Sequence, residues 1–213
     1  MKSTLAFLCA LPLASAMPID RHVKAFQDEL YGIDFGVQSK SAMNLHLLEN
    51  TNTTGAVCLD GTPAGFYFSP AANAENTNNW ELYFQGGGWC YDKEDCWGRS
   101  STALGSSTSW APTSSLGGIM SDDCDSNPDF CNFNRVHMVY CDGNSFSGNR
   151  DDPVEVNGKN LYFRGRRIID EILNTLQQDY GLANAENVLL TGCSAGGLAT
   201  YLHTDYVHDR LDE

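Results

Sequence analysis

The sequence predicts an α/β fold, in which a sheet carries helices on both faces. Residues 56–59 and 66–68 are β-rich runs separated by the turn-forming stretch DGTPAG, so they are predicted to form a hairpin. Residues 80–84 and 136–140 are further predicted strands, and each is followed by a loop that begins with or soon reaches glycine. Helical patterns then alternate with strands, which is the arrangement that places helices against the faces of a sheet.

A long helix is predicted over residues 161–180, and Gly181 follows it where a glycine commonly caps the C-terminus. A strand at residues 188–190 and a second helix come next, whereas the Ser/Thr/Gly-rich residues 100–118 are predicted to form a loop. The apolar side chains that recur at helical spacing in the first helix are Leu161, Ile168, Ile169, Ile172, Leu173 and Leu176.

Residues 1–16 are predicted to be a secretory signal peptide. Lys2 supplies a charged start, residues 5–13 form a short apolar run, and Ala14-Ser15-Ala16 is a small-residue cleavage site. The alternative is a buried N-terminal helix. Residues 17–213 would then form part of one secreted domain, and no other apolar stretch is long enough to cross a membrane as a helix.

The formal net charge of −14 argues against nucleic acid or an anionic membrane as a partner. Acidic residues gather between positions 122 and 129, where solvated loop side chains are expected and a calcium site is the alternative. No other metal and no cofactor are expected, because the sequence has no Cys-x-x-Cys pair or Cys/His cluster. The charge leaves the oligomeric state open.

The cysteines are expected to form disulfides, because the predicted leader directs the chain to an oxidising compartment. Of eight cysteines, Cys9 lies in the leader and an odd number remains, with Cys193 expected to be left over. Short loops favour the pairs Cys90–Cys96 and Cys124–Cys131. Asn52 begins the one N-x-S/T sequon and is a predicted glycosylation site.

The stretch NVLLTGCSAGGLATYLH, residues 187–203, has the layout of a nucleophile elbow. A strand-like run precedes G-x-S-x-G, and a helical pattern follows it. A sharp strand-to-helix turn would expose the hydroxyl of Ser194, and its glycines would avoid clashes in that turn. Ser194 is therefore the candidate nucleophile; a glycine-rich turn without catalysis is the alternative.

The stretch WELYFQGGGWC, residues 80–90, predicts the second part of such a site. Acyl transfer develops an oxyanion, which two backbone N–H groups would stabilise. Ala195 would supply one, and Gly87, Gly88 or Trp89 the other. A phosphate-binding loop is the competing interpretation, but the stretch lacks a G-K-S/T ending and a G-x-G-x-x-G before a helix.

Four blocks resemble, in order, those of the pectin acetylesterase family, which is related to the Notum carboxylesterases. The resemblance implies an α/β-hydrolase-like fold and a serine nucleophile that acts with Asp and His. Ser194 matches the nucleophile, residues 86–89 match the oxyanion segment, and the Cys58–Cys141 disulfide is suggested by the resemblance and by neighbouring predicted strands. The blocks are YFQGGGWCYDKEDCWGRS, VYCDGNSFSGN, LYFRGRRIIDEIL and LLTGCSAGGLATYLH.

The resemblance also implies a substrate. Members of the family remove O-acetyl groups from cell-wall pectin, so an acetylated polysaccharide is the expected partner and the extracellular space or cell wall the expected location. The Notum branch instead implies removal of a fatty acyl group from a secreted protein. A polysaccharide-binding relative without catalysis is the non-enzyme alternative.

The chain departs from the family in length. Family members carry the triad Asp and His downstream of the elbow, whereas this sequence stops one helix beyond Ser194. His203 lies nine residues further on the same helix, about 13 Å along its axis, and His208 is farther, so neither would reach Ser194. His137 is expected to be a core or surface histidine, and Asp142 follows a strand and could face the site, although an acid without a base does not activate a serine. We therefore expect an inactive fragment, truncated after the elbow helix, with the elbow strand at an exposed edge.

Overall fold

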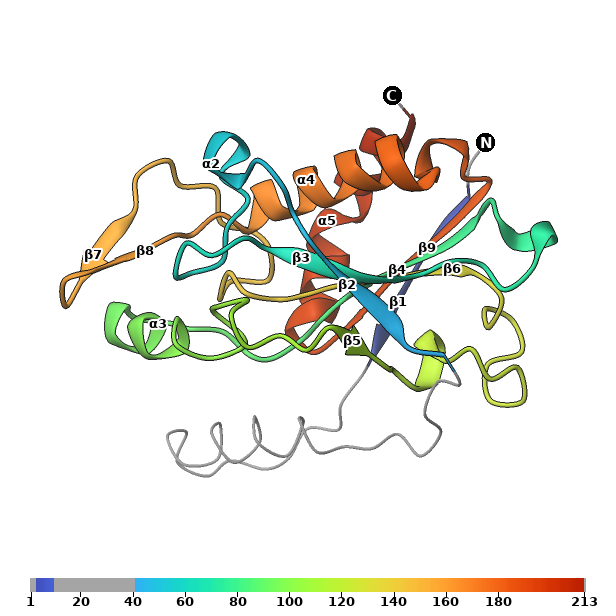
Figure 1. The fold of residues 1–213 in the computed structure, drawn as a ribbon, viewed down its shortest axis with the longest axis horizontal. Helices are drawn as coiled ribbons and strands as arrows, with labels where there is room; N and C mark the ends of the chain where they lie inside the picture. The colour runs from blue at the N-terminus through green and yellow to red at the C-terminus, as the bar shows by residue number, and fades with distance from the viewer. Residues whose placement is uncertain (1–2, 10–40, 213) are drawn as a thin grey trace.

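The computed structural model describes residues 3–9 and 41–212, which form a mixed sheet with helices against it (Figure 1). Its seven strands lie in the order β1-β9-β4-β6-β3-β2-β5. The first four of these are mutually parallel, and β3, β2 and β5 each run antiparallel to their neighbours. The bounds are β1 Ser3–Cys9, β2 Met43–Leu47, β3 Gly65–Ser69, β4 Asn79–Phe84, β5 Thr113–Ser114, β6 Asn134–Met138 and β9 Asn187–Cys193.

The helices and a small hairpin complete the described part. The hairpin pairs β7 Val154–Val156 with β8 Lys159–Leu161. The α-helices are α2 Thr51–Thr54, α3 Lys93–Arg99, α4 Gly165–Thr175 and α5 Ala195–Asp212. Shorter turns are η1 Ala74–Asn76, η2 Gly118–Met120, the π-helical η3 Leu176–Tyr180 and η4 Leu182–Asn184. No helix in residues 3–9 or 41–212 has the length and apolar character of a membrane span.

The α/β fold predicted from the sequence is confirmed, and several of its details are wrong. The predicted helix begins at Gly165, continues through η3, and ends at Gly181, whose φ of 91° and N–H bond to the Leu176 carbonyl make it the expected cap. Leu161 lies in β8 instead. The partner of β3 in the predicted hairpin is also different: β2 pairs with β3, and residues 56–59 contribute only an isolated bridge from Val57 to Pro63.

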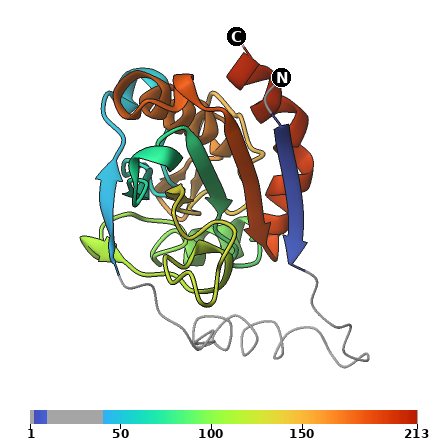
Figure 2. The same ribbon diagram turned by 90° about the vertical axis from the view of Figure 1, so that its right-hand side faces the viewer.

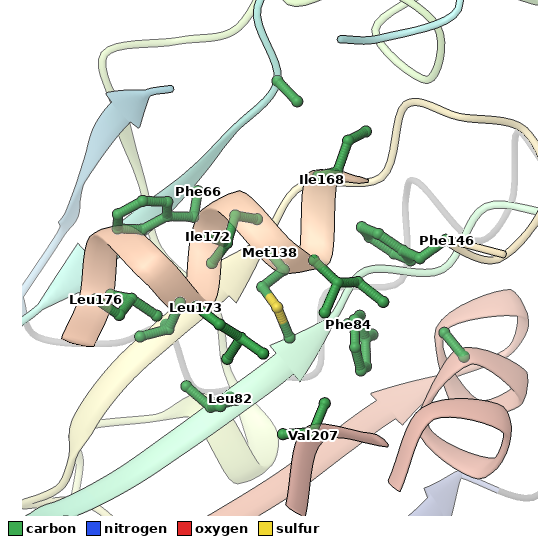
Figure 3. Packing of buried hydrophobic residues seen from close by; sticks show 14 of the residues in the cluster. Phe66, Leu82, Phe84, Met138, Phe146, Ile168, Ile172, Leu173, Leu176 and Val207 are labelled. Atoms are coloured by element: carbon green, nitrogen blue, oxygen red, sulfur yellow. The ribbon is translucent and has the colours of Figure 1, made fainter. Parts of the chain in front are cut away.

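The main core lies between the sheet and the two long helices. Side chains alternate along a strand, so Leu82 and Phe84 of β4 face the same side, where they pack against α4 and α5 (Figure 3). Both long helices therefore cover one face, and not one face each as the sequence predicts. The opposite face is covered within the described residues by the segment around η2, where Met120 packs with Met43 and Tyr67.

Part of the predicted leader forms a strand. Residues 3–9 form β1, which lies beside β9 at one edge of the sheet (Figure 2), in a parallel register that runs from Ser3 opposite Asn187 to Cys9 opposite Cys193. Residues 10–16 lie outside the described residues, and the signal peptide stays a prediction. The expectation that β9 forms an exposed edge is wrong for this chain as folded, because β1 covers that edge.

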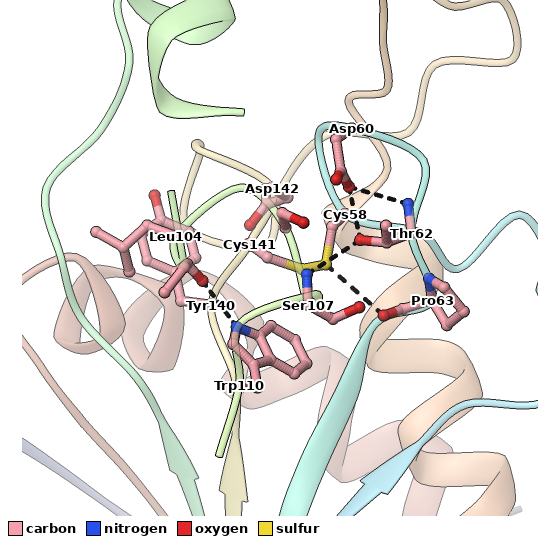
Figure 4. Close-up of a disulfide and its surroundings, with 12 residues drawn as sticks. Cys58, Asp60, Thr62, Pro63, Leu104, Ser107, Trp110, Tyr140, Cys141 and Asp142 are labelled. Carbon is pink, nitrogen blue, oxygen red and sulfur yellow. Dashed lines mark hydrogen bonds between the residues drawn. A yellow bond between two sulfur atoms is a disulfide. The ribbon is translucent and has the colours of Figure 1, made fainter. Parts of the chain in front are cut away.

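Three disulfides join the pairs expected from the sequence: Cys58–Cys141, Cys90–Cys96 and Cys124–Cys131. The first connects the loop before β3 to the loop after β6, and a hydrogen-bonded turn surrounds it (Figure 4). In this turn the Asp60 carboxylate accepts hydrogen bonds from the N–H and hydroxyl of Thr62, at 2.9 and 2.6 Å. Cys193 takes part in none of these three disulfides.

Candidate active site

Ser194 occupies the sharp turn between β9 and α5, as the sequence pattern predicts. Its φ is +56°, a left-handed conformation that is uncommon for a residue with a side chain. The strand ends at Cys193 and the helix begins at Ala195, so the turn consists of Ser194 alone. The side chain is half-buried. This is the strained strand-to-helix turn that presents a nucleophilic serine in α/β enzymes.

The two glycines that flank the elbow are needed for close packing. A Cβ on Gly192 would lie 2.2 Å from the Gly196 carbonyl oxygen, and one on Gly196 would lie 2.0 Å from the Phe84 carbonyl oxygen. Both distances are far shorter than a van der Waals contact. The elbow is therefore packed backbone to backbone against the end of β4, where the glycine-rich loop begins.

The glycine-rich loop passes directly beside the serine. A Cβ on Gly86 would lie 2.4 Å from the Cys193 carbonyl oxygen and 3.2 Å from the Ser194 Cβ. Gly87 and Gly88 have φ values of +141° and +67°, which side chains rarely adopt. The structure thus brings Ser194 together with the loop that was expected to supply an oxyanion donor.

The loop and the start of α5 offer unused backbone donors. The Gly87 carbonyl accepts a bond from Arg99 Nη2 at 2.9 Å, and the Gly88 carbonyl accepts one from the Tyr140 hydroxyl at 2.8 Å. Within residues 41–212, the N–H groups of Gly87, Gly88, Trp89 and Ala195 donate to no other described residue. Amides that are held rigidly and left without an acceptor are what an oxyanion hole requires.

Asp142 has a structural role in the loop after β6. Its carboxylate accepts the N–H groups of Phe146 and Asn144, at 3.1 and 3.3 Å. Burial raises its pKa to about 6, although these hydrogen bonds oppose the shift. A Cβ on Gly165 would lie 2.3 Å from Asp142 Oδ2, so the carboxylate also lies against the start of α4. Both carboxylate oxygens thus accept hydrogen bonds from the loop itself, and Asp142 orients no catalytic base among the described residues.

The histidines within residues 41–212 form no hydrogen bond with Ser194. His203 is buried, and its Nε2 lies 3.3 Å from the Ser145 carbonyl oxygen and 3.5 Å from Ser147 Oγ. His208 pairs with Asp212, at 3.4 Å. His22 lies outside the described residues.

The other two histidines lie among aromatic rings. His137 is buried on β6, where it contacts the rings of Tyr67 and Tyr83, and burial lowers its pKa to about 4. Of the core and surface positions that the sequence left open, it occupies the core. His46 stacks on Phe66 and bonds the Tyr180 hydroxyl at 2.7 Å.

Two buried ionisable side chains on the second face of the sheet were not foreseen. Glu81 and Arg135 are register partners on β4 and β6, and the two residues are 0% and 2% exposed. Burial raises the pKa of Glu81 to about 8, and the positive charge of Arg135 opposes the shift. Arg135 also pairs with Asp122 at 3.6 Å and donates to the Met120 carbonyl at 2.9 Å, so it fastens the covering segment to the sheet.

Metal-binding geometry is absent from the part of the chain that the structure describes, where no three His, Cys, Asp or Glu side chains gather to form a site. Two of the acidic side chains between positions 122 and 129 make contacts with other residues. Asp122 pairs with Arg135, and the Asp123 carboxylate accepts the N–H of Asp125 at 3.4 Å.

Comparison with known proteins shows what the chain is similar to. Residues 37–213 match the family model described as pectinacetylesterase. Pectin acetylesterase 4 of Arabidopsis thaliana is 40% identical over 175 residues, which are 82% of this chain and 42% of that protein. The palmitoleoyl-protein carboxylesterase Notum of Mus musculus is 36% identical over 194 residues, which are 90% of this chain and 36% of that protein.

A solved structure has the same fold. The crystal structure of the Wnt deacylase Notum from Drosophila superposes with a TM-score of 0.71 and 30% identity, covering 80% of this chain and 48% of that one. The chain therefore spans about two fifths of the length of the curated relatives it matches and about half of the solved structure.

Proposed function

The chain belongs to the pectinacetylesterase family, and from this premise we propose that the protein containing it is a secreted serine esterase that removes O-acetyl groups from pectin or a related cell-wall polysaccharide. One observation carries the proposal: the strained Ser194 lies against a glycine-rich loop in which the N–H groups of Gly87, Gly88 and Trp89 have no acceptor among the described residues. The three disulfides fit an oxidising extracellular location.

In the proposed reaction, Ser194 Oγ attacks the acetyl carbonyl carbon and its proton passes to a general base. The N–H of Ala195 and that of Gly88, with Gly87 and Trp89 as neighbouring donors, stabilise the oxyanion that forms. The bond to the sugar oxygen then breaks, the sugar leaves as a hydroxyl, and acetyl-Ser194 remains. Water attacks this ester, acetate departs, and the serine regains its proton.

The base and its orienting acid are proposed to lie outside residues 41–212. A serine hydroxyl is a weak nucleophile unless a base lies within hydrogen-bond reach, and the histidines at 46, 137, 203 and 208 all have other surroundings. We therefore propose that residues 17–213 alone have no esterase activity, although they hold the nucleophile and the oxyanion donors.

A second function is removal of a fatty acyl group from a protein. The observation that favours it is the superposition on a Wnt deacylase, with a TM-score of 0.71. The two reactions share the nucleophile and the oxyanion hole, and they differ in the acyl chain that the site accepts. A polysaccharide-binding protein without turnover is the third outcome that an experiment must separate.

The test uses the full natural protein, expressed through a secretory pathway. A fluorophosphonate probe should label the wild type and leave Ser194→Ala unlabelled, with exposed Ser109→Ala as the matched control. Acetylated pectin should release acetate, p-nitrophenyl acetate should be hydrolysed, and a long-chain ester should be hydrolysed far more slowly. Turnover by Ser194→Ala within tenfold of wild type would refute the assignment of the nucleophile, and preference for the long-chain ester would favour the protein deacylase.

A further inference from the structure

The side chain of Ser145 connects the two segments that carry the candidate oxyanion donors. Its Oγ accepts a hydrogen bond from Trp89 Nε1 at 2.7 Å and donates one to the Ala195 carbonyl at 2.8 Å. Trp89 ends the glycine-rich loop, and Ala195 begins α5. A single hydroxyl group, with one proton to donate and lone pairs to accept, therefore bridges the loop and the elbow.

A second connection reaches the same loop through Tyr140. The Ser145 N–H donates to the Tyr140 hydroxyl oxygen at 3.0 Å, and that hydroxyl donates to the Gly88 carbonyl at 2.8 Å. Burial raises the pKa of Tyr140, so its proton stays available for this bond at physiological pH. This bond fixes the direction of the Gly88 carbonyl. The N–H of Trp89 belongs to the same planar peptide group, so its direction is fixed as well.

The backbone at Ser145 adopts an unfavourable conformation to make these contacts. Ser145 and Phe146 have φ values of +48° and +59°, although neither is glycine. The Asp142 carboxylate holds this turn by accepting the N–H of Phe146. Gly165 packs closely against the turn, because a Cβ added to it would lie 2.5 Å from the Phe146 Cα. Strained conformations persist only where their surroundings hold them in place, and they concentrate at functional sites.

Ser145 is too deeply buried to contact a substrate. Ser145 is 1% exposed, whereas Trp89 is 46% exposed. A substrate can therefore reach the loop and cannot reach the Ser145 hydroxyl, which leaves positioning as its role.

We propose that Ser145, supported by Tyr140, is a positioning residue. It sets the separation between the two N–H donors of the oxyanion hole, Ala195 on the elbow and Gly88 on the glycine-rich loop. The inference rests on the proposed esterase function. Oxyanion donors act only within a narrow range of distances from the developing charge, and a shift of about 1 Å in a reacting geometry lowers rates by about 100-fold. Loss of the Ser145 bridge should therefore reduce the rate of the chemical step while substrate binding stays nearly unchanged.

The test compares Ser145→Ala, Tyr140→Phe and the control Ser147→Ala in the full natural protein. Ser147 lies on the same loop, and its hydroxyl contacts the Ser145 carbonyl and His203 without reaching either donor segment. We expect Ser145→Ala to lower kcat at least about tenfold with KM within twofold of wild type, because the donors lose their alignment. Tyr140→Phe should act in the same direction, and Ser147→Ala should leave kcat within twofold.

A trifluoromethyl ketone provides the readout that a merely structural role would not change. This inhibitor forms an oxyanion on the serine, so its affinity should fall by the same factor as kcat in Ser145→Ala. Equal kcat and inhibitor affinity in wild type and Ser145→Ala would overturn the positioning role while the esterase function stands. If Ser145→Ala does not fold, Tyr140→Phe decides, and an unchanged kcat in it overturns the proposal. A wild type without Ser194-dependent turnover would refute the function, and the positioning role with it.

Discussion

The packing between the elbow and the glycine-rich loop predicts a large effect for one methyl group. In Gly196→Ala the new Cβ would lie 2.0 Å from the Phe84 carbonyl oxygen and 2.8 Å from the Gln85 carbonyl carbon. Both atoms belong to the backbone at the end of β4, so no side chain can rotate away. Relief of the overlap requires α5 and the loop to separate by roughly 1 Å or more.

This separation should affect both rate and stability. The two candidate donors lie on the segments that move apart, Ala195 on the elbow and Gly88 on the loop. A displacement of about 1 Å lowers enzymatic rates by about 100-fold, so kcat should fall by about that factor. Overpacking of a well-packed interior also lowers the free energy of unfolding by about 1–3 kcal/mol.

The assay measures kcat on p-nitrophenyl acetate and the urea midpoint of unfolding, in the full natural protein. Gly98→Ala is the matched control, because a Cβ at Gly98 in α3 would have no atom within 4 Å. That variant should keep its activity and gain up to about 1 kcal/mol, since alanine is the better helix former. A Gly196→Ala protein with kcat within threefold of wild type and an unchanged midpoint would show that the backbones are not packed as tightly as described.

Three other predictions concern stability and modification. Because the folded-state pKa of Glu81 is raised to about 8, the folded state keeps a proton that the unfolded state has lost above pH 4.5, so stability should fall as pH rises from 4.5 to about 8 and level off above that. Chemical denaturation between pH 6.5 and 9 should show this fall in wild type and a flatter profile in Glu81→Gln, and equal profiles would contradict it. Loss of the Cys58–Cys141 disulfide, with a sequence separation of 83, should cost about 4.5 kcal/mol in unfolding, against about 2.4 kcal/mol for Cys90–Cys96 with a separation of 6; the opposite order would refute the loop-entropy reasoning. Asn52 is exposed on α2, so the secreted protein should lose mass on treatment with a peptide N-glycosidase, and Asn52→Gln should show no such change.

The sequence predicts best where local chemistry decides the structure. The elbow at Ser194 depends on a short strand, three close glycines and a following helix, all within a few residues. The disulfides that close short loops and the cap at Gly181 are of the same kind. Each of these features depends on steric limits of a short segment of chain.

Features that depend on contacts between distant segments were missed. Glu81 stands between apolar residues in β4, so strand alternation suggests a solvent-facing side chain. It is buried because β4 is a central strand with both faces covered. Ser145 gives no local signal either, since its partners Trp89 and Ala195 are 56 and 50 residues away. The apolar run that predicts a leader fits a strand equally well, and residues 3–9 form one in the structure.

The Cys58–Cys141 disulfide has a consequence for proteolysis. It closes a covalent ring that includes β3, β4, α3 and β6, together with exposed residues near positions 101–103 and 111–113. A protease that cuts one of these exposed sites opens the ring without releasing a fragment, because the two pieces remain joined through the sulfur atoms. The glycine-rich loop and β6, the strand that precedes Tyr140, therefore stay joined by a covalent bond after a single cut, until a reductant breaks the disulfide.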